Sequence, residues 1–117
     1  MVKRLLITKL NYTTMENLSI YEIIKILGKS KVIDILKSLS HSEKTLTELQ
    51  FDVRAQISTT QRAIDALLSA GLIKRKEKKR NNRVVTVYQL TPLGWKVLRW
   101  LDALEDNLSS GLLTTTA

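Results

Sequence analysis

Apolar residues recur at helical spacing through the first third of the chain. Between residues 16 and 27 they return every third position, which predicts an amphipathic helix. Residues 30–39 repeat the pattern and predict a second helix. Residues 1–15 follow no clean period, so we expect an N-terminal arm there. The repeating positions of the first helix are Leu18, Tyr21, Ile24 and Leu27.

Two capping signals predict a pair of short helices further along the chain. Thr45 and Glu48 have the spacing of a capping box, in which each side chain bonds to the other residue's backbone amide. They predict a helix over residues 46–51. Ser58 and Gln61 have the same spacing and predict the start of a second, longer helix. Two helices joined by a tight turn are a candidate helix-turn-helix motif.

After Gly71 the chain changes to two extended runs, residues 72–79 and 83–90. The second run is rich in Val, Thr and Tyr, as strands are. Asparagines lie between the runs, and Asn tolerates the positive φ that tight hairpin turns need. We therefore expect a β-hairpin with one face on the core. The predicted register pairs Ile73 with Leu90, Arg75 with Tyr88, and Lys79 with Val84.

A long helix is predicted over residues 92–108. Thr91 is a good cap, and Pro92 suits the first helical position. The apolar residues of this helix cover more than one stripe, which exceeds what the core of one small domain needs. For residues 109–117 (SSGLLTTTA) we expect a disordered tail.

Positive charge is concentrated on the predicted hairpin. The chain has a net charge of +8, with 19 Lys and Arg residues against 11 Asp and Glu residues. Seven of the basic residues fall between residues 72 and 83, where Glu77 is the only acid. A localised basic block is typical of a protein that binds a polyanion. The alternative is a solvated hairpin whose charges serve solubility.

Composition excludes several kinds of site. The 117-residue chain has no Cys, which excludes disulfides, thiol nucleophiles and zinc–thiolate sites. His41 is the only histidine, so a multi-histidine metal site is excluded as well. Four glycines form no phosphate-binding loop, and no carboxylate pair suggests catalysis. We therefore expect that the protein is not an enzyme and that it binds no metal or cofactor. Apolar runs are too short to span a membrane, and the first ten residues do not resemble a signal peptide.

Three segments carry a resemblance to winged-helix transcriptional regulators. Residues 27–36 resemble the opening of HxlR-type domains, although a common tryptophan is missing. Residues 58–67, followed by 70–75, resemble the recognition helix and following strand of MarR, ArsR and HxlR types. Residues 88–94 (YQLTPLG) resemble the exit from the wing into the last helix. The resemblance implies an α+β fold, mainly α with a small β-hairpin: a winged helix-turn-helix domain over residues 16–108.

The resemblance also implies a function and a site. Such proteins act as homodimers that bind double-stranded DNA sequence-specifically, with the second helix of the motif in the major groove. The wing then contacts the backbone or the adjacent minor groove. Asp65 is expected to orient Arg62. The implied recognition residues are Gln56, Ser58, Thr59, Gln61 and Arg62. The implied wing residues are Lys76, Lys78, Lys79, Arg80, Asn82 and Arg83.

The first and last helices are the expected dimerisation elements. An exposed apolar surface on both would be buried by a second copy, and aromatic residues are favoured anchors in interfaces. A two-fold dimer would place two recognition helices about one DNA turn apart. The alternative is a last helix that folds back on its own domain. The expected interface residues are Tyr21, Ile24, Trp95, Trp100, Leu101 and Leu104.

Two other functions stay open. An architectural DNA-binding protein would use the same charge with little sequence preference. A winged-helix module that binds proteins is a further alternative. RNA and membrane binding are less favoured, because aromatic residues do not cluster and the charge is not on an amphipathic helix. No convergent polar set supports a small-molecule effector. We expect a cytoplasmic, nucleoid-associated protein of a prokaryote or its virus.

Overall fold

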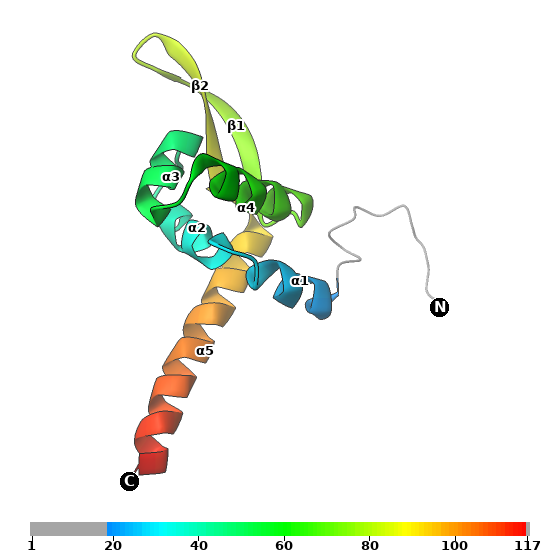
Figure 1. Ribbon diagram of the computed structural model, residues 1–117, viewed down its shortest axis with the longest axis vertical. Helices are drawn as coiled ribbons and strands as arrows, with labels where there is room; N and C mark the ends of the chain where they lie inside the picture. The colour runs from blue at the N-terminus through cyan, green and yellow to red at the C-terminus, as the bar shows by residue number, and fades with distance from the viewer. Residues whose placement is uncertain (1–18, 117) are drawn as a thin grey trace, which may run out of the picture.

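The computed structural model describes residues 19–116, with side chains up to Leu108. Over these residues the chain forms five helices and one antiparallel hairpin, which confirms the expected α+β fold (Figure 1). The predicted N-terminal arm, residues 1–15, lies outside the described residues. The elements are α1 (Ile20–Leu27), α2 (Val32–Leu39), α3 (Leu46–Val53), α4 (Ile57–Ser69), β1 (Ile73–Arg80), β2 (Arg83–Leu90) and α5 (Pro92–Thr116).

The first two helices start later than the apolar period predicts. Ser19 is extended, and its side chain forms a capping box with Glu22, so α1 begins at Ile20. Such a cap stabilises a helix by about 1 kcal/mol. Lys31 has a left-handed backbone (φ 69°), which delays α2 to Val32. Periodicity detects the apolar face of a helix, whereas these backbone conformations fix its ends.

One of the two predicted capping boxes between residues 45 and 61 is confirmed. Thr45 and Glu48 bond each other's amides at the start of α3. The second prediction is wrong, because Ser58 already lies inside the first turn of α4. The left-handed Arg54 (φ 54°) shortens the turn, and α4 begins at Ile57 after Gln56, which makes no side-chain cap bond.

The hairpin has the predicted register. Ile73 pairs with Leu90, and the two turn asparagines both have positive φ, 52° and 64°. Lys44 adds a bridge to the outer edge of β2 through two backbone bonds with Tyr88. The expectation of one buried face is incomplete, because Val87 on the opposite face is also fully buried. The base of the hairpin is therefore enclosed on both faces.

The core lies between α2, α3 and α4. Most of its fully buried side chains come from these helices and from the residue before β1, and β2 adds Val87. The hairpin base and the first turns of α5 close it, through residues such as Tyr88 and Leu98. The helix-turn-helix pair and the hairpin thus share one rigid base. The largest fully buried apolar side chains are Ile35, Leu36, Leu49, Ile64, Leu67 and Leu72.

The last helix begins as predicted and runs further than predicted. Thr91 accepts a bond from the Gly94 amide (3.1 Å) and donates one to the Gly71 carbonyl (2.6 Å), which fixes the corner between β2 and α5. The helix then leaves the body and continues to Thr116 (Figure 1). The expected disordered tail is therefore helical up to that residue. No proline follows Pro92, and Gly111 alone does not end the helix.

Candidate nucleic-acid interface

One face of α4 is turned to solvent along its whole length. The helical repeat places Thr60, Ala63, Ile64 and Leu67 on the buried side. Thr60 also donates its hydroxyl to the Gln56 carbonyl at 3.0 Å, so its role is packing. The opposite side is polar and is free to meet a ligand. Its exposed residues are Ser58, Arg62, Asp65 and Ser69.

The five predicted recognition residues do not all share that face. Gln56, Ser58 and Arg62 are exposed. Thr59 is half-buried on one flank, where it lines a hollow with Lys29. Gln61 is half-buried on the other flank and donates to the Asp65 carboxylate at 3.2 Å. The described contacts of Asp65 are therefore with Gln61, where we expected an Arg62 partner.

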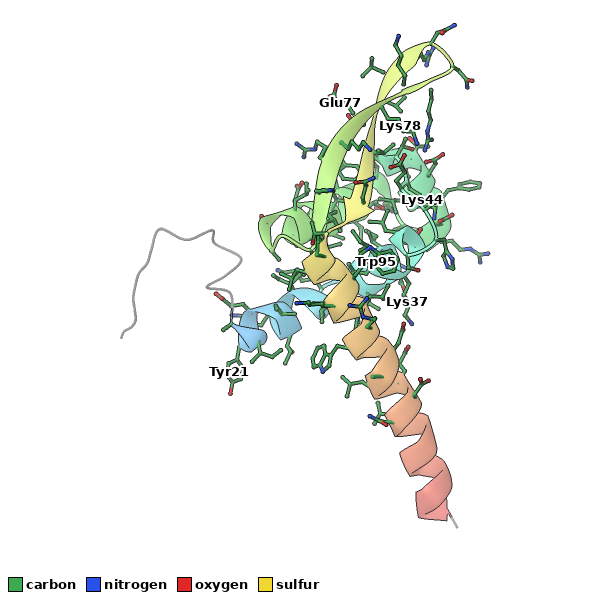
Figure 2. The ribbon with its side chains drawn as sticks, turned by 180° about the vertical axis from the view of Figure 1, so that it is seen from behind. Tyr21, Lys37, Lys44, Glu77, Lys78 and Trp95 are labelled. Carbon is green, nitrogen blue, oxygen red and sulfur yellow. The ribbon has the colours of Figure 1, made fainter. Side chains whose placement is uncertain are left out.

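Two of the predicted hairpin cations are held by acids near the start of the helix-turn-helix, Glu43 before α3 and Glu48 in α3. Lys78 pairs with Glu43, and the Arg80 guanidinium lies 2.9 Å from the Glu48 carboxylate. Lys78 and Glu77 are consecutive on β1 and therefore point to opposite faces of the hairpin (Figure 2). The other predicted residues have no ion-pair partner within residues 19–108. These are Lys76, Lys79, Asn82 and Arg83, all exposed.

Glu43 and Glu48 tie the hairpin to the body, and we call these two residues the acidic clamp. Glu43 accepts from Lys78 on β1 and from Gln89 on β2 (2.6 Å), and these bonds lower its pKa. The Thr45 amide lowers the pKa of Glu48 most, with Arg80 adding to the effect. Sequence patterns did not reveal the clamp, because Glu43 and Glu48 lie more than thirty positions from the hairpin residues that they bind.

Arg75 on β1 stacks on its cross-strand partner Tyr88. Its guanidinium lies 6.0 Å from the centre of the Tyr88 ring, at cation–π distance.

Comparison with known proteins supports the architecture built above. Residues 31–85 match the sequence model of the MarR family, from the start of α2 into β2. Solved structures with similar folds include proteins described as transcriptional regulators of the MarR, PadR and possible ArsR families. The domain is a winged helix-turn-helix. The hairpin is its wing, and α4 stands at the position of its recognition helix. The likeness is to transcriptional regulators and not to enzymes.

Two structures illustrate the likeness. A proposed MarR-family transcriptional regulator from Enterococcus faecalis V583 has a TM-score of 0.71 at 18% identity, covering 94% of this chain and 96% of that one. The homodimeric winged helix-turn-helix DNA-binding domain of Mb0332 from Mycobacterium bovis has a TM-score of 0.56 at 18% identity, covering 80% and 81%. At these identities the likeness shows the fold.

A closer sequence relative comes from an archaeon. An uncharacterized protein of Methanocaldococcus jannaschii is 36% identical over 78 residues. The aligned segment covers 65% of this winged-helix chain and 65% of the relative's length.

The predicted dimer residues are mostly solvent-accessible in this winged-helix chain. Tyr21 on α1 is 76% exposed and points away from the body (Figure 2). Ile24, Trp95, Trp100 and Leu104 are each 39–50% exposed. Leu101 differs from the others, because it packs against the core of its own domain. It is therefore a core residue at least as much as an interface residue.

Exposed apolar residues also occur outside α1 and α5. Phe51 on α3 is 86% exposed, and Ile57 at the start of α4 is 53% exposed. The sequence signals for these two helices did not indicate which way either side chain points.

The described part of the chain lacks two other types of site. Residues 19–116 hold no group of three or more His, Cys, Asp or Glu side chains arranged to hold a metal. None of the described helices is long and apolar enough to cross a membrane.

Proposed function

We propose that this protein is a sequence-specific transcriptional regulator that binds double-stranded DNA as a homodimer. The main observation in support of this proposal is the solvent-facing polar side of α4, which lies next to a wing with a strong excess of positive charge. An α-helix fits the major groove of B-DNA, and cations on an adjacent hairpin suit the phosphate backbone.

The exposed side chains of α4 suit base recognition. Arg62 has the donor geometry for guanine, and glutamine has that for adenine, so Gln56 and Gln61 are both candidates. Ser58 suits a base edge or a phosphate. Thr59 lies on the flank and suits a phosphate better than a base. The uncapped N-terminus of α4 adds backbone amides that favour an anion.

The wing cations divide into two groups. Lys76, Lys79 and Arg83 are exposed and available to phosphates or a narrow minor groove, with Asn82 beside them at the tip. Lys78 and Arg80 hold the wing to the acidic clamp. They support DNA binding mainly by fixing the position of the wing, and less by their own charge.

The proposed dimer interface is formed by α1 and α5. Together they present Tyr21, Ile24, Trp95, Trp100 and Leu104, and α5 projects well beyond the domain that carries it. A second copy would bury these side chains and align two recognition helices on one face of DNA. The Mycobacterium bovis domain, which is described as homodimeric and DNA-binding, supports this assembly.

The test is fluorescence anisotropy with the gene's own upstream duplex and a shuffled duplex over a salt series. We expect a preference of about a thousandfold or more for the upstream duplex at moderate salt. Equal affinity for both duplexes, falling together with salt, would instead support an architectural DNA-binding protein. Absence of binding to either would favour a protein-interaction module.

A further inference from the structure

Three basic residues that the sequence analysis did not single out lie in two turns beside the recognition helix. Lys29 and Lys31 lie in the turn between α1 and α2, and Arg54 lies in the turn between α3 and α4. We call them the turn surface. Lys29 and Arg54 are exposed and Lys31 is half-buried. None of the three has an ion-pair partner among the described residues.

One shallow hollow connects the turn between α1 and α2 with α4, and a second lies between α2 and the C-terminal end of α3. Lys29 and Ser30 line one hollow together with Thr59 and Arg62. Lys31 and Arg54 line the other. In Figure 1, α4 lies between the wing on one side and the connection from α1 to α2 on the other. The turn between α1 and α2 and the wing therefore lie on opposite sides of α4, and Arg54 lies in the turn that leads into α4.

Carboxylates near the turn surface do not cancel its charge. Asp34 and Asp52 also line the second hollow. Asp52 is already engaged, because it accepts from Ser38 at 2.6 Å and lies 3.4 Å from the Lys44 ammonium. Lys37 also lines this hollow and pairs with Glu105, so Asp34 is left with two cations there that have no described ion-pair partner, Lys31 and Arg54. The balance remains positive and complementary to a phosphate backbone.

The backbone of two of these residues is energetically unfavourable. Lys31 and Arg54 both have left-handed φ values, 69° and 54°, which cost free energy in any residue other than glycine. Glycine would fit both positions better. Fold stability alone would therefore favour glycine at positions 31 and 54.

We propose that the turn surface binds the sugar-phosphate backbone of the DNA strand that borders the major groove on the side away from the wing. This proposal rests on the proposed function, since it needs α4 to lie in that groove. The recognition helix would then be anchored from both sides, by the wing and by the turn surface.

The decisive variant is Lys31→Gly with Arg54→Gly. Both changes relieve left-handed strain and remove one charge each, so the melting temperature should stay equal or rise. The salt dependence of DNA binding, as log–log slope, should fall by about 0.9 for each lost contact, and affinity at 0.1 M salt by roughly tenfold for each. Lys31→Arg, which keeps the charge, should keep the slope. Higher stability with weaker binding is a combination that a purely structural role does not produce.

Two further variants separate this proposal from the proposed function. Lys96→Gln with Arg99→Gln removes the same charge from exposed positions on α5 and should leave the slope unchanged. Lys79→Gln with Arg83→Gln should lower the slope through the wing. If the wing variant lowers the slope and the glycine variant does not, the turn surface does not bind DNA, although the proposed function stands. If the α5 variant lowers the slope as much as the glycine variant does, the change reflects net charge alone, and the turn surface proposal is wrong. A wild-type protein that binds neither duplex would overturn both proposals.

Discussion

Gly94 occupies a place where no side chain fits. A β-carbon added there would lie 2.0 Å from the Leu72 carbonyl oxygen, which is backbone and cannot swing away. The amide of Gly94 also caps α5 through Thr91. The glycine therefore permits the close approach between the start of α5 and the strand that leads into the wing.

Gly94→Ala should destabilise the fold by about 1–3 kcal/mol, the typical range for overpacking a filled site. Gly28→Ala is the matched control, because an added β-carbon there meets nothing nearer than 3.6 Å and the backbone has ordinary helical angles. The measurement is urea unfolding of both variants. Equal stability of the two would mean that the corner between β2 and α5 relaxes easily.

Arg62 is the exposed residue of α4 best suited to carry sequence discrimination. Arg62→Ala should lower the ratio of specific to non-specific affinity. The expected loss in the corresponding free-energy difference is about 1–3 kcal/mol, the usual cost of losing a bidentate base contact. Ser69→Ala, on the same exposed face two turns later, should leave that ratio unchanged. Anisotropy on upstream and shuffled duplexes measures both. A ratio unaffected by Arg62→Ala would mean that another face of α4 meets the bases.

At the scale of elements, the acidic clamp decides where the wing points. A two-stranded hairpin is marginally stable by itself. Here its base is buried, Lys44 adds a bridge to β2, and Glu43 and Glu48 hold its outer half against the body. The wing is therefore held in a fixed orientation relative to α4, although its tip reaches into solvent.

The clamp predicts a pH dependence of stability. Hydrogen bonds and ion pairs lower the pKa of both glutamates in the folded state, so the unfolded chain binds their protons more readily. The stabilisation is present above the unfolded value of about 4.3 and is lost as the pH falls through the lower folded values. Urea unfolding between about pH 3 and pH 7 should show this loss.

The double variant Glu43→Gln with Glu48→Gln should have a weaker pH dependence, and Gln still serves in the capping box. Glu77→Gln removes an acid from the opposite face of β1 and should behave like the wild type. The same acid sensitivity in the double variant and the wild type would place the responsible carboxylates elsewhere.

At the scale of the whole molecule, α5 is larger than its own domain requires. Val97 and Leu98 fill the core, and the Lys37–Glu105 ion pair (3.1 Å) ties the middle of the helix to α2. Trp100 and Leu104 remain 39% exposed, and Leu108 is 65% exposed. A helix of this length and composition suits an assembly of two chains.

Trp100→Glu with Leu104→Glu should give a monomer by sedimentation and weaken binding to a palindromic duplex by at least tenfold, because the two half-sites lose their linkage. Phe51→Glu, which changes an equally apolar but more exposed site on α3, should leave the oligomeric state unchanged. Circular dichroism checks that both variants fold. A folded double variant that remains dimeric would remove α5 from the interface.

The sequence by itself determined the number and order of the described helices, the hairpin register and the cap at Thr91. These features depend on local chemistry: apolar period, capping side chains, and asparagines that accept positive φ. The same local signals failed at the start of α4, where a left-handed Arg54 shortened the turn, and at the last helix, where residues typical of a tail continue as helix to Thr116.

Only the tertiary structure decided which charges are available to a ligand. Lys78 and Arg80 look equivalent to Lys79 and Arg83 in the sequence, yet the first pair is held by glutamates more than thirty positions away. Likewise, Arg54 lies more than twenty positions from Lys29 and Lys31, and only the packing of the helices brings it into one hollow with Lys31. Electrostatic neighbours are set by distance in space, and sequence spacing determines that distance only within a helix or a hairpin.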